Sequence, residues 1–153
     1  FSSFEVFINT LNTAKSMLAL NTGKEMLLDA MLIAIHNIAL PMLDMSGYEW
    51  STGVSSNPEL EYFYVNWRED AEKLIIVFSD EEPQSFLIPN ATSTQISDMI
   101  TTIPDLNAYV FSTSPTGWNN ITNTNTGGYY TLAPDTSSML ANLLEILDEN
   151  VCE

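Results

Sequence analysis

The stretch Lys73–Ser85, KLIIVFSDEEPQS, decides the fold of this chain. Its residues Leu74–Phe78 are apolar without polar alternation and include β-branched types. That pattern is typical of a strand buried on both faces of a parallel sheet, so we expect this strand in the middle of its sheet. The following Ser79–Glu82 adds one hydroxyl and three carboxylates, and Pro83 prevents continuation. Oxygen ligands therefore gather at the carboxyl edge of the strand, where ligands bind in open α/β sheets.

The composition indicates one acidic domain with a substantial core. The chain has 153 residues, and 45% of them are hydrophobic, which is enough for a single core. Four Lys and Arg residues against 20 Asp and Glu residues give a formal net charge of -16. Phosphate backbones and anionic membrane surfaces repel such a chain, so we expect no nucleic-acid binding. The carboxylates form a solvated surface, attract hard divalent cations, or do both.

Three further features concern processing and location. No apolar stretch is long enough to span a bilayer, so we expect no membrane insertion. The chain starts at Phe1 rather than Met, which we interpret as a processed, cleaved or trimmed end, and one interpretation of the single Cys152 is pairing with an upstream cysteine. The sequons Asn90–Thr92 and Asn120–Thr122 are expected by chance in a chain so rich in Asn and Thr, and alone they indicate little.

Apolar residues at three- and four-residue spacing predict four helices. Residues 3–18 form an amphipathic pattern, and Ser93–Ile103 a shorter one that ends at a proline. Glu25–Leu40, EMLLDAMLIAIHNIAL, is apolar on more than one side and stops at Pro41, which predicts a buried helix packed on a sheet. Thr136–Val151 predicts a closing amphipathic helix.

Shorter apolar runs predict the remaining strands. Leu106–Ser112 indicates a second buried strand, Tyr129–Leu132 a third, and Phe86–Ile88 a short extended piece. Tyr62–Trp67 is either a short edge strand or the lead-in to the first strand. The polar run 119–128 indicates a loop. The order of elements predicts the second half of a doubly wound, mostly parallel α/β domain with helices on both faces of the sheet.

Several segments together resemble a von Willebrand factor type A domain. They are T-G-K-E-M-L-L-D-A-M at 22–31, W-R-E-D-A-E-K-L-I-I-V-F-S-D-E at 67–81, W-N-N-I, G-G-Y-Y-x-L and a final helix ending at a cysteine. The integrin-β and hemicentin-like branch is the most similar. There, a Glu precedes an Asp-Ala pair by four residues, as Glu25 precedes Asp29-Ala30, and a Trp-Arg pair such as Trp67-Arg68 precedes the central strand.

The resemblance implies a metal site and an incomplete domain. Such domains bind Mg²⁺ or Ca²⁺ through three loops at the carboxyl edge, and Glu25 and Asp80 match metal-ligand positions of the second and third loops. The first loop, D-x-S-x-S, has no counterpart here, nor have the first strand, the first helix and the next two strands. Residues 1–153 are therefore expected to be the C-terminal part of one such domain, incomplete at its N-terminus, with a loop insertion at about 41–61. The missing half of the sheet would come from upstream sequence, a second polypeptide or another subunit.

The resemblance implies a non-enzymatic adhesion or protein-protein interaction module, extracellular or at the cell surface, that binds a protein ligand through a divalent cation. The alternative is a metal-free structural or filament subunit that uses the fold only for packing. One interpretation of the final helix ending at Cys152 is a disulfide to an upstream cysteine.

A hydrolase has little support in the residues. There is no G-x-S-x-G motif, and Glu81 and Glu82 are adjacent and do not face one another as an acid–base pair. His36 is the only histidine, and we interpret it as structural, with zinc binding and general-base work as the alternatives. We therefore expect no catalytic residues.

Overall fold

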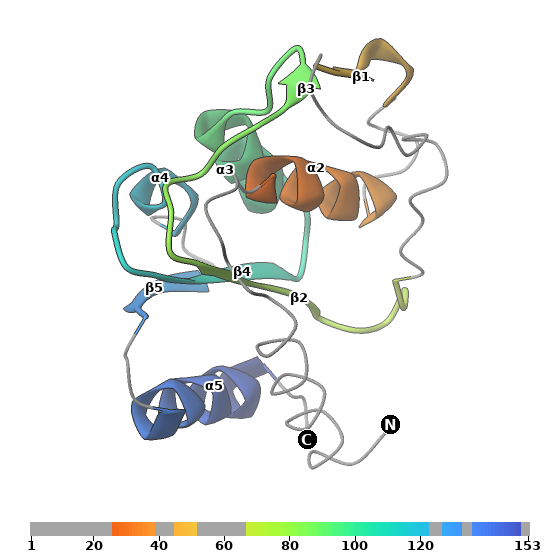
Figure 1. The fold of residues 1–153 in the computed structure, drawn as a ribbon. Coiled ribbons are helices and arrows are strands. Elements are labelled where there is room, and N and C mark those ends of the chain that lie inside the picture. The colour runs from red at the N-terminus through yellow and green to blue at the C-terminus, as the bar shows by residue number, and fades with distance from the viewer. Residues whose placement is uncertain (1–25, 39–44, 52–66, 123–126, 133–135, 151–153) are drawn as a thin grey trace.

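The computed structural model describes residues 26–38, 45–51, 67–122, 127–132 and 136–150. These parts of the chain form a layered α/β arrangement in which helices lie on both sides of a parallel sheet (Figure 1). The helices are α2 (Leu27–Ile38), the 3₁₀ helix η1 (Met45–Gly47), α3 (Ser93–Thr102), α4 (Asn119–Thr122) and α5 (Thr136–Asn150). The strands are β1 (Glu49–Trp50), β2 (Lys73–Ser79), β3 (Leu87–Ile88), β4 (Leu106–Ser112) and β5 (Gly127–Thr131).

The main sheet has the strand order β2-β4-β5, and both pairs of neighbours are parallel. This arrangement confirms the predicted α/β class and the predicted strands, and the expected middle position of Lys73–Ser79 stays a prediction. Within the described residues β4 is the middle strand and β2 lies at an edge. An apolar run shows that both faces of a strand are covered, and it does not show how many strands lie beside it.

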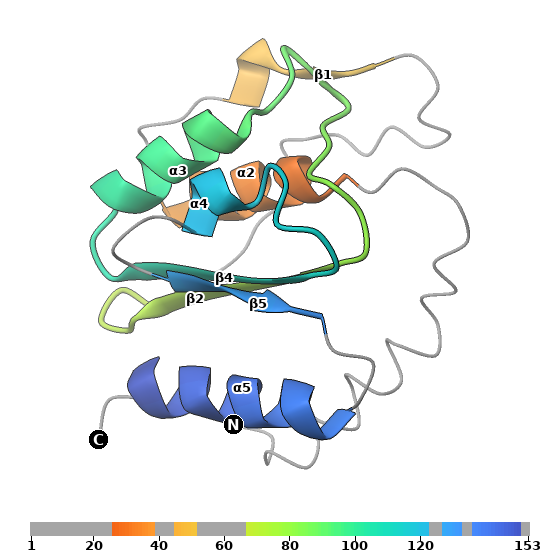
Figure 2. The ribbon, with the colours of Figure 1, turned by 90° about the vertical axis from the view of Figure 1, so that its left-hand side faces the viewer.

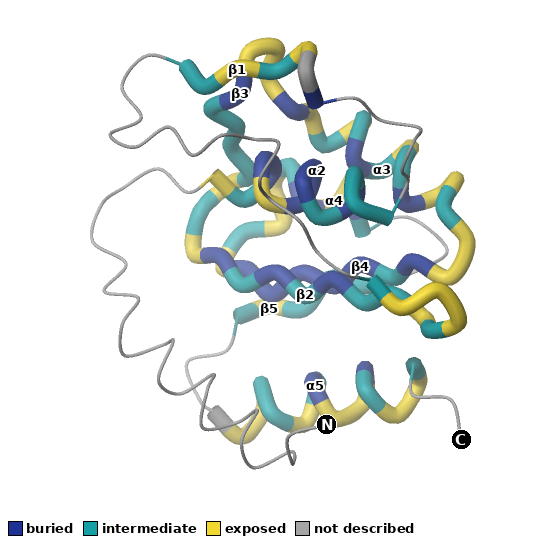
Figure 3. The backbone as a smooth tube through the Cα atoms, turned by 90° about the vertical axis from the view of Figure 1, so that its right-hand side faces the viewer, coloured by how far each residue is buried: buried dark blue, intermediate teal, exposed yellow. Residues whose placement is uncertain are grey.

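Side chains alternate between two layers because successive residues of a strand point to opposite faces. On one face, Ile75 and Val77 of β2 and Val110 of β4 belong to the core formed with α2, α3 and α4. Figure 2 shows these three helices together on that side of the sheet, with α5 alone on the other. In Figure 3 the buried segments run along the strands and the sheet-facing sides of the helices, which marks the core.

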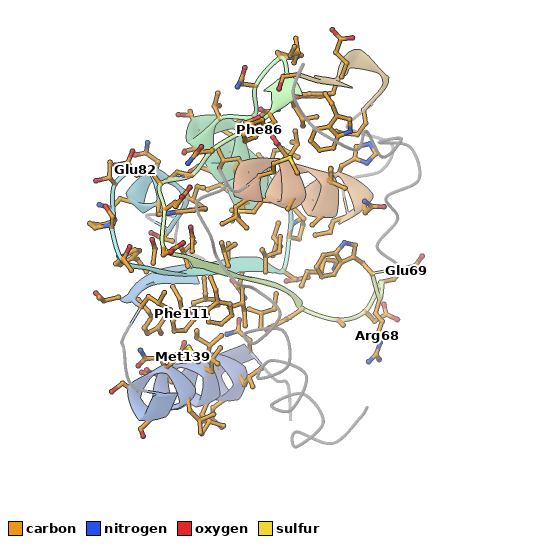
Figure 4. The ribbon with its side chains drawn as sticks, in the orientation of Figure 1. Arg68, Glu69, Glu82, Phe86, Phe111 and Met139 are labelled. Carbon is orange, nitrogen blue, oxygen red and sulfur yellow. The ribbon has the colours of Figure 1, made fainter. Side chains whose placement is uncertain are left out.

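A row of aromatic rings covers the face toward α5. Phe78, Phe111 and Tyr130 occupy matching positions on the three strands. The rings of Phe78 and Phe111 stack with centroids 4.9 Å apart, and those of Phe111 and Tyr130 stack at 5.0 Å. Phe111 is buried and packs in one cluster with Leu143 and the partly buried Met139 of α5, toward which it points in Figure 4. Helix α5 thus packs against this row of aromatic rings.

Two local predictions need correction. The polar run 119–128 contains α4 and the first residues of β5, although a loop was predicted there. The predicted loop 41–61 contains η1 and β1, and β1 pairs antiparallel with β3. The elements η1 and β1 are short, and tertiary contacts hold them in place. One such contact is the hydrogen bond of 2.8 Å from Gln95 Nε2 to Oη of Tyr48, which lies between η1 and β1. Sequence periodicity does not reveal contacts of this kind.

Several other predictions are confirmed or lie outside the described residues. The helices predicted at 25–40, 93–103 and 136–151 are present as α2, α3 and α5, and α3 begins with Thr92 as its N-cap. The predicted helix at 3–18 and most of the 62–67 segment lie outside the described ranges. Among the helices that the structure does describe, none has the length and apolar character needed to cross a membrane.

Gly127 provides a sharp test of the β4–β5 register. Its φ of 135° is strained for other residues, and a Cβ atom there would overlap the carbonyl oxygen of Ala108. We expect Gly127→Ala to lower the free energy of unfolding by about 2 kcal/mol or more, measured by chemical denaturation. The neighbouring Gly128→Ala is the control, because its Cβ would meet only ordinary contacts from 3.6 Å, and it should be neutral or slightly stabilising. Equal losses in the two variants would contradict the register.

Tyr130 predicts a dependence of stability on alkaline pH. Burial raises the pKa of its phenol, and the nearby carboxylates of Glu145 and Glu149 and the phenol of Tyr109 raise it further. Because the folded pKa exceeds the unfolded one, the contribution to stability is present below pH of about 10 and is lost as pH rises through the folded pKa.

The test is the pH titration of the Tyr130 ring in the folded protein, followed residue by residue by NMR, because absorbance would sum over six tyrosines. Glu145→Gln should lower the pKa of Tyr130, because it removes one of the charges that raise it. Asp148→Asn removes the same charge from the same helix and should leave that pKa unchanged. A titration of Tyr130 insensitive to Glu145→Gln would contradict the assignment.

Candidate functional site

The carboxyl edge of the sheet is built from a row of hydroxyl residues. Ser79, Ser112 and Thr131 are the last residues of β2, β4 and β5 and are aligned with one another. Ser79 is 2% exposed and Ser112 is 0% exposed. Because the three strands are parallel, the chain leaves all of them at this edge, and the segments that follow are brought together.

The two serines serve the turns that follow their strands. Ser79 Oγ accepts a hydrogen bond from Glu81 N and donates one to Glu81 O, both at 3.0 Å. Ser112 Oγ accepts from Ser114 N at 3.4 Å, and Ser112 O accepts from Tyr129 Oη at 2.7 Å. These hydroxyl groups therefore shape the backbone at the strand ends.

The loop after β2 and the loop after β4 interlock. Thr113 Oγ1 donates to Asp80 O at 2.9 Å, and the indole N–H of Trp118 donates to Glu81 O at 2.9 Å. Trp118 is fully buried. Gly117, with φ 76°, lies so close to Pro83 that a Cβ atom would come within 2.6 Å of the proline ring. The two loops are thus fixed to one another by hydrogen bonds and close packing.

Where the two loops interlock, the backbone carbonyls of the loop after β2 accept hydrogen bonds from the loop after β4, and carboxylates lie at the surface. Asp80 and Glu82 are exposed, while Glu81 is half-buried and its Oε2 accepts from Gln84 Nε2 at 2.9 Å. In Figure 4 Glu82 lies on the outside of this edge, at the opposite end of the molecule from Arg68. The carboxyl edge therefore presents acidic side chains on a backbone that hydrogen bonds and close packing between the two loops hold in place.

The start of α2 meets the same edge. Leu28 N donates to Gln84 O at 3.2 Å, which joins the first turn of α2 to the loop after β2. One residue further on, Asp29 is 1% exposed. Its carboxylate accepts a short hydrogen bond from the Ser85 hydroxyl and a bond of 2.7 Å from Phe86 N. Two donors thus stabilise a carboxylate that is otherwise removed from water.

Ser85 extends this connection toward α3. Its Oγ accepts from Ala91 N at 2.8 Å and from Leu87 N at 3.3 Å, while it donates to Asp29. The carboxylate of Asp29, the hydroxyl of Ser85 and the backbone of residues 86–91 form one polar network beneath the surface. This network fixes the path of the chain from the carboxyl edge to α3.

Asp29 is the residue that sequence reasoning missed. In the sequence, Asp29 stands out only as one half of the Asp29-Ala30 pair of the family resemblance. A signal was present, because Leu28 and Leu32 on either side of it belong to the core and a charge beside such a stripe needs a partner. Its donors are 56 and 57 residues away in sequence, so their identity was not visible.

The structure describes one of the two predicted metal ligands. Asp80 lies at the carboxyl edge, as expected from its position after β2. Glu25 lies outside the described residues, one position before Met26, and so does Cys152. His36 is half-buried in the last turn of α2. Within the parts of the chain that are described, no three His, Cys, Asp or Glu side chains are grouped as a metal site.

A test of the buried network compares two aspartates. Asp29→Ala leaves the Ser85 hydroxyl and Phe86 N–H without their acceptor in the interior, so we expect a loss of about 3 kcal/mol in the free energy of unfolding. Asp98→Ala in α3 removes the same charge from an exposed position and should change stability by less than about 0.5 kcal/mol. Denaturant unfolding measures both, and similar small effects would show that the network contributes little.

Comparison of the chain with family models, with curated proteins and with solved structures gave no match. The resemblance to von Willebrand factor type A domains stays a prediction from the sequence. We therefore infer the function from the geometry of the carboxyl edge.

Proposed function

We propose that this chain is a non-enzymatic protein-interaction module, extracellular or at the cell surface, that binds a protein ligand at the carboxyl edge of its parallel sheet. The observation that carries the proposal is the interlock of the loops after β2 and β4. Two hydrogen bonds and the contact of Gly117 with Pro83 fix these loops before any ligand arrives. A surface fixed in this way loses little conformational entropy on binding.

The finer fold that we propose is a doubly wound, von Willebrand A-like domain. Three parallel strands with helices on both faces, and chain order α2, β2, α3, β4, α4, β5, α5, are in keeping with that fold. In this proposal the outer edge of β2 pairs with a further strand, which upstream sequence, a second polypeptide or another subunit would supply.

We further propose that Mg²⁺ or Ca²⁺ takes part in ligand binding, with Asp80 and Glu25 as ligands. Asp80 is exposed at the end of β2, and the bond from Leu28 N to Gln84 O brings the start of α2 to the same edge. Hard cations prefer carboxylate oxygens of this kind. The described residues alone do not form a complete cation site, so further ligands would come from the rest of the domain.

A metal-free structural subunit is the second candidate, and a specific observation favours it. Ser79 Oγ, the carbonyl of Asp80 and the carboxylate of Glu81 are all engaged in hydrogen bonds that close the loops. The loops after β2 and β4 then serve packing, and the same edge would be buried against another subunit.

Two exposed carboxylates in one loop allow a matched test. In the complete domain, Asp80→Ala should weaken divalent-dependent ligand binding by about tenfold or more, because it removes a proposed metal ligand. Glu82→Ala removes the same charge two residues away and should have little effect. Calorimetry with Mg²⁺ and Ca²⁺ and a ligand-binding assay with and without EDTA measure both variants.

The outcomes separate the two candidates. Equal weakening by the two variants would indicate general electrostatic attraction and contradict a specific role of Asp80. EDTA-sensitive binding retained in Asp80→Ala would also contradict that role. Binding of another subunit that is insensitive to EDTA and to both substitutions would support the metal-free structural subunit.

A further inference from the structure

We propose that Asn90 is a site of N-linked glycosylation, an inference that rests on the extracellular location in the proposed function. Asn90 lies in the loop between β3 and α3, and it is the first residue of the sequon Asn90–Thr92. Both Asn90 and Thr92 are exposed, whereas Ala91 between them is only 3% exposed. The sequon is therefore anchored by its middle residue and open to solvent at its two functional residues.

The backbone of this sequon lies outside any helix or strand and is tied at its middle residue. Thr92 is extended, with φ -121° and ψ 149°, and Ala91 N donates to Ser85 Oγ at 2.8 Å. Asn90 Nδ2 donates to Ser85 O at 3.1 Å, and Thr92 Oγ1 accepts from Gln95 N at 3.1 Å. The amide of Asn90 and the hydroxyl of Thr92, the two groups that define the sequon, thus belong to exposed residues before α3.

The second sequon, Asn120–Thr122, lies within α4 and lacks this geometry. Residues two apart on a helix are separated by about 200° around its axis, so its Asn and Thr point to different sides. Ile121 is fully buried, and the hydroxyl of Thr122 donates to Trp118 O at 3.3 Å. Asn120 is exposed, but its sequon is helical and the Thr122 hydroxyl is turned to the backbone of its own turn, so we expect the folded chain to favour the sequon at Asn90.

The modification is compatible with the contacts of Asn90. In the transfer, the amide nitrogen forms a bond to C1 of a sugar carried by a lipid-linked pyrophosphate donor. The bond from C1 to the pyrophosphate breaks, lipid pyrophosphate leaves with the electron pair, and the amide loses one proton. Asn90 Nδ2 donates to Ser85 O at 3.1 Å in the structure, and the remaining N–H can keep that bond.

The test uses the full 153-residue chain, directed by a cleavable leader through the secretory pathway of a eukaryotic cell line. Secreted and cell-retained protein is digested with glutamyl endopeptidase under conditions in which it cleaves after both Glu and Asp, which places Asn90 and Asn120 in different peptides. The peptide with Asn90 is analysed by mass spectrometry before and after treatment with peptide:N-glycosidase. We expect a glycan on Asn90 in the natural sequence and in Thr92→Ser, and complete loss in Asn90→Gln and Thr92→Asp.

Thr92→Asp is the decisive variant because Thr92 is also the N-cap of α3 and accepts from Gln95 N at 3.1 Å. Aspartate caps a helix at least as well as threonine but ends the sequon, so α3 should stay folded while the glycan is lost. Asn120→Gln should leave the glycan mass unchanged. An unmodified Asn90 in the natural sequence, or a glycan only at Asn120, would overturn the proposal.

The two proposals fail in distinguishable ways. Asp80→Ala should carry the same glycan as the natural sequence. Glycosylated protein without Asp80-dependent binding would overturn the proposed function alone. An unmodified Asn90 in protein that binds its ligand through Asp80 would overturn only the glycosylation site.

Discussion

The rest of the structure depends on the parallel pairing of β2 with β4. All seven residues of β2 are in register with β4, from Lys73 beside Leu106 to Ser79 beside Ser112. On one face this register stacks Phe78 on Phe111, and these rings form the surface against which α5 packs. At the carboxyl edge it brings the two exits of the chain side by side. Without that alignment, the loops after the two strands could not interlock.

A single buried carboxylate links this edge to the helical layer. Removing a carboxylate from water costs free energy, which hydrogen bonds must offset. Asp29 receives bonds from Ser85 and Phe86, and Ser85 in turn holds the backbone before α3. The arrangement is specific because other paths of the loop would leave the charge buried without donors. Apolar packing positions α2 over the sheet, and Asp29 determines how the loop passes it.

Much of the fold was predictable from local patterns, because strands and helices of normal length carry their own periodicity. Leu106–Ser112 and the helix capped by Thr92 were predicted closely, and Asp80 was correctly expected at the carboxyl edge. That β4, and not β2, has both its neighbours among the described strands was not predictable, because an apolar run does not identify the lateral neighbours of a strand. Helix α4 was missed because its four residues carry too little periodicity, and the partners of Asp29 were missed because they are distant in sequence.

The span of the contacts at the carboxyl edge has a consequence for folding kinetics. The bond from Thr113 to Asp80 joins residues 33 apart, that from Trp118 to Glu81 joins residues 37 apart, and that from Phe86 to Asp29 joins residues 57 apart. Closing such long intervals costs chain entropy before any contact is gained. Helices α3 and α5 can begin from local contacts alone. We therefore expect the proposed binding edge to assemble late, so that its closure marks the completion of folding.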